Sequence, residues 1–477
     1  MARPESRREV GPRLILARWR TGDTIAGRWH VREVLAGPYG VVYVVFDNES
    51  GEVLAAKTFS DALLHWDRIL PHRLKKEALP WLKLGHHQNV VQPRFIHSVD
   101  GCPLLFMQYV CGTHLGQWIG SACLIDDSAM ILHFALQLCD GLEHAQSNGI
   151  GAHRDVRPEN CLITPQRVLK VADPGLSRSL DESLIAAAGD ARSAVRIRTR
   201  ADLVELVHGR RTEDGQHGVA AAAYLAPEQF AGSKHVDRRA DIYAFGVLLF
   251  QMVTGKLPFV AASWTEFERL HKTREPPPLA QRHQLFAEVI QTCLAKEAPQ
   301  RFTDFAAVRR HLAQLYRSLT GETHVPPLEA DELEAEDCDN QGLGQLRFGY
   351  LRQALGSFER ALELSPDHPV LWAHKGEALR QLGQSDEALI CHQVSIELDS
   401  KCVAAWYHRG LALRVLERFS EALACHERAL ELDPRCWQAW MDKGLTFAAL
   451  GQRQAELACY DRVLELNPRH DGPGRYS

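Results

Sequence analysis

The pattern of apolar and polar positions changes along this chain, and its most regular part lies in the last third. There, tryptophan recurs every 34 residues, a glycine follows each tryptophan by four residues, and alanine and proline keep the same interval. The positions are Trp372, Trp406, Trp440, Gly342, Gly376, Gly410, Gly444, Ala354, Ala388, Ala422, Pro366, Pro434 and Pro468. Each unit holds two amphipathic stretches, such as 406–416 and 419–432, and is therefore predicted to be a pair of helices.

The small residues and the proline of each unit have simple physical roles. Glycine and alanine fit where the paired helices cross closely, and proline ends the second helix. Because one helix pair cannot bury its apolar face alone, neighbouring pairs are expected to stack into a solenoid. The pattern resembles the tetratricopeptide repeat. We count four units over residues 335–470, followed by a tail at 471–477.

The chain upstream of the repeats follows a different pattern. Short β-branched runs broken by turn residues predict strands over 29–59, and the pattern after Leu115 is mostly helical. This order predicts an α+β domain, which we place at residues 22–316. The stretch 317–334 contains two prolines and a dense acidic run and is predicted to be a linker. Residues 1–21 are predicted to be a basic N-terminal arm.

Length and composition limit the class of protein. The chain has 477 residues, too many for one hydrophobic core, so at least two domains are expected. It is 45% hydrophobic and 24% charged with a formal net charge of -5, which does not indicate nucleic acid or an anionic membrane as a partner. No segment reaches the roughly 18 apolar residues that span a bilayer, and no signal peptide is recognised. We therefore expect a cytoplasmic protein with no membrane span and no nucleic-acid partner.

Six motifs in residues 22–316 stand in one order and at one set of spacings. The most specific is HRDVRPEN at 153–160; the others are VLAGPYGVVY at 34–43, LAAK at 54–57, KVADPGL at 170–176, APE at 226–228 and DIYAFG at 241–246. They resemble the catalytic domain of bacterial, eukaryotic-like serine/threonine protein kinases. The resemblance implies a bilobal α+β kinase fold, followed here by an all-α solenoid. It also implies ATP-dependent phosphorylation of serine and threonine hydroxyls in protein substrates.

The resemblance assigns catalytic roles to four residues. Asp155 would accept the proton of the substrate hydroxyl. Arg157, which stands where lysine is usual, would keep a positive charge near the γ-phosphate. Lys57 would bind the α- and β-phosphates, and Glu77 lies about where its carboxylate partner belongs.

The resemblance also implies the cofactors ATP and Mg²⁺ or Mn²⁺. Asn160 would hold one metal ion, and Asp173 would chelate the ion that bridges the β- and γ-phosphates. The stretch 105–110 resembles the hinge whose backbone contacts adenine. The residues predicted to bind the nucleotide are Gly37, Gly40, Val42, Ala55, Lys57, Met107, Gln108, Val110 and Leu162.

Several departures from the family pattern leave other functions open. One loop glycine is missing, Pro174 replaces the usual phenylalanine, and alanine stands at 220–221 where a threonine usually helps to position catalytic groups. A pseudokinase scaffold that binds nucleotide or partners without phosphoryl transfer is the alternative to an active kinase. A third reading makes the repeats the main function and the kinase domain vestigial. The long, basic stretch between Asp173 and Glu228 is interpreted as a functional or disordered insert.

Stacked repeats form an extended concave surface, and we expect this one to recruit a protein or peptide partner. Polar residues on the first helix of each unit are candidates to bind an acidic or C-terminal peptide segment. Those with basic side chains are His374, Arg380, His408, Arg414 and Lys443.

Overall fold

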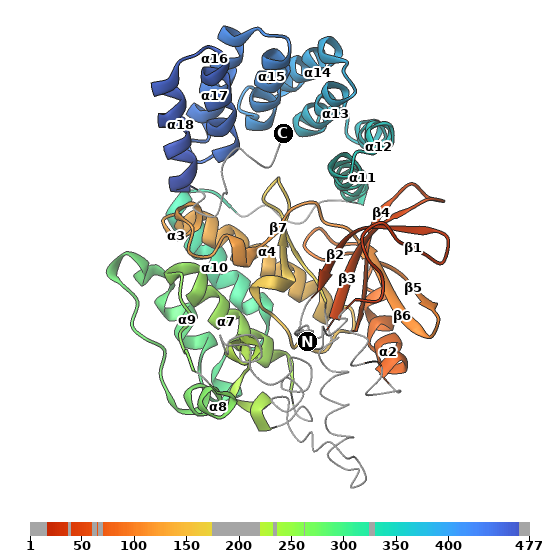
Figure 1. The fold of residues 1–477 in the computed structure, drawn as a ribbon. Coiled ribbons are helices and arrows are strands. Elements are labelled where there is room, and N and C mark those ends of the chain that lie inside the picture. The colour runs from red at the N-terminus through yellow and green to blue at the C-terminus, as the bar shows by residue number, and fades with distance from the viewer. Residues whose placement is uncertain are drawn as a thin grey trace, which may run out of the picture.

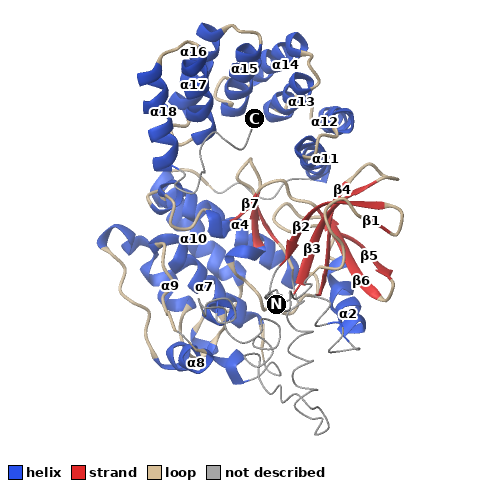
Figure 2. Cartoon of the chain, in the orientation of Figure 1, coloured by secondary structure: helices blue, strands red, loops and turns tan. Residues whose placement is uncertain are grey.

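The structure is a computed structural model that describes residues 17–36, 40–59, 64, 70–173, 220–231, 236–261, 263–323 and 330–466. Two lobes come first in the chain, and a curved array of helix pairs follows and arches over them (Figure 1). Strands are concentrated in the first lobe, and the array is entirely helical where it is described (Figure 2). The predicted fold class, a bilobal α+β unit followed by an all-α solenoid, is confirmed.

The first lobe is an antiparallel sheet of six strands in the order β1-β2-β3-β4-β6-β5, with one long helix against it. The strands are β1 (Thr24–Ile25), β2 (Trp29–Ala36), β3 (Gly40–Asp47), β4 (Val53–Phe59), β5 (Pro93–Val99) and β6 (Cys102–Gln108). Helix α2 (Leu70–Leu82) places Leu74, Ala78 and Trp81 on one apolar stripe. This stripe packs against Leu105 and Met107 of β6 and so covers one face of the sheet.

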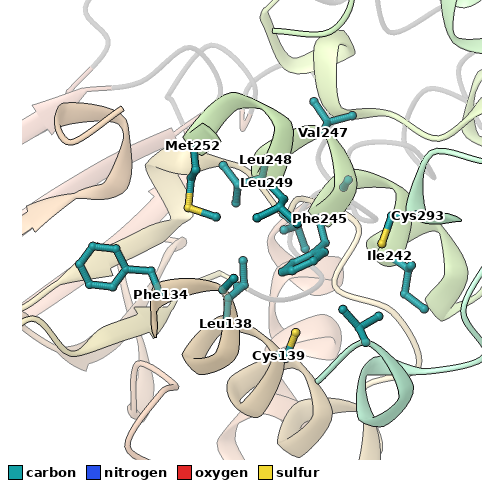
Figure 3. Packing of buried hydrophobic residues seen from close by; sticks show 14 of the residues in the cluster. Phe134, Leu138, Cys139, Ile242, Phe245, Val247, Leu248, Leu249, Met252 and Cys293 are labelled. Carbon is teal, nitrogen blue, oxygen red and sulfur yellow. The ribbon is translucent and has the colours of Figure 1, made fainter. Parts of the chain in front are cut away.

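The second lobe is helical and surrounds one large apolar core. Its helices are α3 (Ala122–Ile125), α4 (Ser128–Ser147), α7 (Arg238–Thr254), α8 (Trp264–Thr273), α9 (Ala287–Cys293) and α10 (Phe305–Thr320). A small sheet of β7 (Thr113–His114), β8 (Cys161–Ile163) and β9 (Leu169–Val171) lies at its edge. Figure 3 shows Leu138 of α4 meeting Phe245 and Leu249 of α7 in this core. Asp127 caps α4 by accepting from the Met130 N–H, and Gly255 ends α7 with a φ of +72°.

The array consists of four helix pairs. The helices are α11 (Ala330–Arg347), α12 (Leu351–Leu364), α13 (Pro369–Gln381), α14 (Ser385–Leu398), α15 (Val403–Val415), α16 (Phe419–Leu432), α17 (Trp437–Ala449) and α18 (Arg453–Leu466). Of the stretch 317–334 expected to be a linker, α10 includes residues up to Thr320 and α11 begins at Ala330. The first repeat helix thus starts five residues before the predicted array.

The repeated residues have repeated contacts. A Cβ atom added at Gly410 would lie 2.5 Å from Cε1 of His426, so only glycine lets α15 approach the ring on α16. The same clash would occur between Gly342 and Phe358, Gly376 and His392, and Gly444 and Tyr460. Each repeat tryptophan donates from its indole N–H to a carbonyl six residues earlier, in the turn that precedes its helix. The acceptors are Pro366 for Trp372, Ser400 for Trp406 and Pro434 for Trp440.

The array contacts the two lobes at both of its ends. Helix α11 lies beside β4 of the first lobe, and α18 lies beside α3 of the second (Figure 1). Toward the far end, the turn between α16 and α17 forms two ion pairs with the second lobe. Arg167, in the β8–β9 turn, pairs with Asp433, and Arg435 lies 3.1 Å from Asp127 Oδ2. The array and the lobes therefore form a closed ring.

Candidate active site

The catalytic-loop motif is held by one buried carboxylate. Asp241, at the start of α7, accepts from the backbone N–H groups of His153 and Arg154, both at 2.7 Å. Burial raises the pKa of Asp241, while nearby His153 and these two hydrogen bonds oppose the rise. His153 in turn contacts the Ala172 carbonyl at 2.9 Å, which ties the loop to the strand that leads to Asp173. Sequence reasoning had treated Asp241 only as part of a helix start.

Three predicted site residues come together on this loop. Asn160 donates from Nδ2 to Asp155 Oδ2 at 2.9 Å and to the Asp155 carbonyl at 2.8 Å. Arg157 Nε lies 3.5 Å from Asp155 Oδ1. The Asp155 carboxylate is thus oriented from both sides, and its side chain remains 26% exposed.

Lys57 of β4 extends to this group from the first lobe. Its ammonium group donates to Asp173 Oδ2, although 116 residues separate the two. Glu77, the predicted partner of Lys57, lies on α2, and the pairing of Glu77 with Lys57 stays a prediction. Asp173 has a φ of +63°, a backbone conformation that non-glycine residues seldom adopt and that often marks functional sites.

The carboxylate of Asp173 also fits a metal ion. Its second oxygen, Oδ1, is buried and has no hydrogen-bond partner among the described residues. A buried carboxylate oxygen without a partner is costly, and a divalent cation would satisfy it. Asn160 is fixed nearby on η2 (Pro158–Asn160), where Ala172 N–H donates to its carbonyl at 2.9 Å. The candidate ligand atoms are carboxylate and amide oxygens, which suit Mg²⁺ or Mn²⁺.

Several residues predicted to contact adenine are apolar and come from both lobes. Met107 and Val110 are buried in one cluster, and Ala55 and Leu162 pack against it from the first and second lobes. Val42 pairs with Lys57 across strands β3 and β4. Gly40 is required by a close approach, because a Cβ atom there would lie 2.7 Å from the Thr58 carbonyl oxygen. Gly37, Pro174 and most of the activation segment lie outside the described residues.

The pairing expected between Glu228 and Arg301 is confirmed. The guanidinium group of Arg301 is fully buried and donates to the two carboxylate oxygens of Glu228 at 2.7 and 2.9 Å. This bidentate pair anchors the end of the activation segment to the second lobe.

Sequence comparison identifies both parts of the molecule. A profile of the protein kinase domain matches residues 30–313, more than half of the chain. The chain belongs to the protein kinase family. Profiles of the tetratricopeptide repeat match residues 357–390 and 413–475. Within the described residues, no helix combines the length and apolar character needed to cross a membrane.

Several bacterial protein kinases are similar to this one. Serine/threonine-protein kinase pkn3 of Myxococcus xanthus is 30% identical over 266 residues, which cover 55% of this chain and 44% of that protein. Serine/threonine-protein kinase Pkn1 of the same organism is 28% identical, with coverage of 59% and 37%. The chain therefore spans less than half the length of these relatives. The solved PknI kinase domain of Mycobacterium tuberculosis is 23% identical, with coverage of 62% and 98% and a TM-score of 0.44.

The predicted hinge and the residues directly after it have a contact that sequence reasoning missed. Helix α11 lies along the outer edge of the first lobe, and its polar side chains bind backbone groups there. Asn340 donates to the Tyr109 carbonyl and accepts from the Cys111 N–H at 3.1 Å. Gln341 exchanges two hydrogen bonds with Val53, at 3.0 and 3.2 Å. The only local feature that could have suggested this contact is the pair of adjacent amide side chains, Asn340 and Gln341, which follow an acidic run.

Acidic residues at the start of α11 meet cations of the kinase domain. Glu336 lies 3.0 Å from the buried Lys170 ammonium. Asp337 contacts His86 at 3.1 Å and Arg94 at 3.4 Å. Burial alone would raise the pKa of the Asp337 carboxyl, but the hydrogen bond from His86 and the nearby positive charges lower it below the usual value. These two acidic residues, which directly follow the predicted linker, therefore dock α11 onto the kinase domain.

The candidate peptide-binding cations of the repeats already have carboxylate partners. The pairs are His374 with Asp339, Arg380 and His408 with Glu377, Arg414 with Asp442, and Lys443 with Glu427. Burial opposes ionisation of Glu377, but hydrogen bonds from Arg380 and His408 lower its pKa well below the usual value. The side chains that sequence analysis proposed for binding an acidic or C-terminal peptide are thus largely neutralised by carboxylates.

Proposed function

We propose that this chain is an active serine/threonine protein kinase that transfers the γ-phosphoryl group of ATP to protein hydroxyls. The arrangement of Lys57, Asp155, Asn160 and Asp173 around one point between the lobes carries the proposal. Phosphoryl transfer depends mainly on positioning and charge neutralisation, which these groups supply. The relatives named above are serine/threonine-protein kinases, which supports the same reaction.

The proposed roles follow from the contacts. Asp155, oriented by Asn160 and Arg157, would accept the hydrogen bond of the incoming hydroxyl and take its proton. Lys57 would exchange Asp173 for the α- and β-phosphates when nucleotide binds. Asp173 and Asn160 would hold Mg²⁺, which neutralises developing charge on the phosphate oxygens.

Incubation with labelled ATP and Mg²⁺ tests this function. Wild-type protein should label itself or a generic substrate. Asp155→Asn should reduce transfer by about 10²–10⁴-fold, the range for loss of a general base. Lys57→Met should also abolish transfer, whereas Lys83→Met, a matched change at an exposed lysine, should not. Nucleotide binding by wild-type protein without any transfer, in Mg²⁺ or Mn²⁺, would instead support the pseudokinase alternative.

We also propose that the repeats recruit a protein partner. The repeat profiles support the proposal, because stacked units of this kind present extended binding surfaces. Since the cations on the first helices are paired with carboxylates, a peptide with both charges should compete better than a purely acidic one. Binding of acidic and mixed-charge peptide libraries to the full chain checks this. Equal, salt-insensitive binding of all peptides would contradict it.

A further inference from the structure

Asn340 occupies an unusual position for a repeat residue. It is 4% exposed, and its side chain reaches the hinge, which connects the two lobes of the kinase domain. Its Nδ2 donates to the Tyr109 carbonyl, and its Oδ1 accepts from the Cys111 N–H at 3.1 Å. A residue of the solenoid thus satisfies two backbone groups of the hinge.

A primary amide meets both requirements at this position, because it carries a donor and an acceptor side by side. The Tyr109 carbonyl needs a donor, and the Cys111 N–H needs an acceptor. A carboxylate would keep the acceptor and place a second oxygen against the carbonyl. An aliphatic side chain would leave both buried groups without a partner.

The backbone geometry also indicates which groups of the hinge face away from α11. Successive residues of an extended chain direct their backbone N–H and C=O groups to opposite sides. The Gln108 N–H, at the end of β6, donates to the Gln92 carbonyl at 2.8 Å. Since Tyr109 and Cys111 bind α11, this alternation would direct the backbone groups of the intervening Val110 away from α11. Val110 is a predicted adenine contact, so α11 and the nucleotide would bind opposite sides of this short segment.

The surrounding contacts make α11 a rigid support. Gln341 binds both backbone groups of Val53 at the start of β4. Asp337 accepts from the Gln108 side chain at 2.6 Å. A Cβ atom added at Gly344 would lie 3.0 Å from the Tyr109 ring, so the helix lies directly against the hinge. The position of α11 against the hinge therefore does not depend on a single hydrogen bond.

We infer that Asn340 is a positioning residue for the nucleotide site. Through its two hydrogen bonds, the first repeat helix would fix the conformation of the hinge segment that contacts adenine. This inference rests on the proposed function, because it takes the hinge to be the adenine site. It makes α11 part of the nucleotide-binding unit, although it lies outside the residues that match the kinase profile.

Calorimetric binding of Mg²⁺ complexes of two nucleotides tests the inference on the full chain. The nucleotides are ATP and purine riboside triphosphate, which lacks the exocyclic amine that would donate to the hinge. Wild-type protein should prefer ATP. Asn340→Asp should raise the ATP dissociation constant by about tenfold, as expected for a disturbed pair of hydrogen bonds. It should change binding of the second nucleotide much less, so that most of the preference is lost.

Gln345→Glu is the matched control. Gln345 lies on the same helix and donates to the Gly51 carbonyl at 2.7 Å, away from the hinge. The same amide-to-carboxylate change there should disturb docking of α11 and leave the nucleotide preference within about twofold of wild type. Because the preference is a ratio of two dissociation constants, partial unfolding of a variant does not alter it.

The outcomes separate the inference from the function. Equal preference in wild type and Asn340→Asp, or an equal loss in both variants, would overturn the inference and leave kinase activity untouched. Wild-type binding without phosphate transfer would overturn only the proposed transfer. Wild-type protein that bound neither nucleotide would overturn both.

Discussion

Two buried histidines make the stability of the repeat array depend on pH. His392 and His426 occupy the same position in the second and third repeats and have no exposed surface. Neither ring has a hydrogen-bonded nitrogen among the described residues. Burial lowers the pKa of each from 6.5 to about 3. The titratable and charged groups around them are His408, Glu377, Arg380 and Arg409 at His392, and Arg414 and Lys443 at His426.

The direction and size of the effect follow from linkage. Between pH 6.5 and pH 3 the unfolded array binds protons that the folded array excludes, so the free energy of unfolding falls as the pH falls. It is unaffected well above pH 6.5. From pH 7 to pH 5, each histidine should cost about 2 kcal/mol, and the two together about 4 kcal/mol.

Phenylalanine is the natural test substitution, because Phe358 fills this position in the first repeat. A urea gradient with pulsed hydrogen exchange, read on peptides from α14 to α16, reports the array separately from the kinase lobes. Wild-type protein should lose about 4 kcal/mol more between pH 7 and pH 5 than the double variant His392→Phe, His426→Phe. The exposed His368→Phe should behave as wild type. The same pH dependence in wild type and double variant would refute the reasoning.

Three further predictions concern packing and ion pairs. Gly410→Ala should destabilise the array by about 1–3 kcal/mol, because the added methyl group clashes with the His426 ring on α16. Gly356→Ala should stabilise the array by up to about 1 kcal/mol, because this helical glycine has open space around it. Urea denaturation checks both. Arg167→Asp should increase hydrogen exchange in the turn after α16, and adding Asp433→Arg should restore protection unless the pair contributes nothing. Arg301→Lys should lower stability by about 2–3 kcal/mol in thermal unfolding, because lysine cannot replace the buried bidentate fork; an unchanged melting temperature would contradict this.

The repeats could be predicted almost completely from sequence. Their contacts join residues within one unit or between neighbouring units, so the same side chains return every 34 residues. Gly376 and its ring partner His392 are 16 residues apart, and the tryptophan caps span six. The catalytic loop is equally local, since Asn160 and Asp155 are five residues apart.

The contacts between distant segments could not be predicted in this way. Lys57 contacts Asp173, 116 residues downstream, and sequence reasoning did not predict this contact. The docking of α11 depends on Val53 and Tyr109, more than 220 residues upstream of the amides that bind them. Periodicity and composition describe one segment at a time, so an acidic helix that pairs with distant cations looks the same as a solvated linker.

Because the array is attached to the kinase domain at two separate points, the distance between these points constrains the number of repeats. A solenoid fixed at one end can gain or lose a unit, because each repeat contacts only its neighbours. Here, α11 rests on the hinge, and the turn after α16 meets Arg167 and Asp127 of the second lobe. Inserting one more 34-residue unit between these points would carry Asp433 and Arg435 past their partners. The array thus acts as an arch of fixed span, and its length is matched to the width of the kinase domain beneath it.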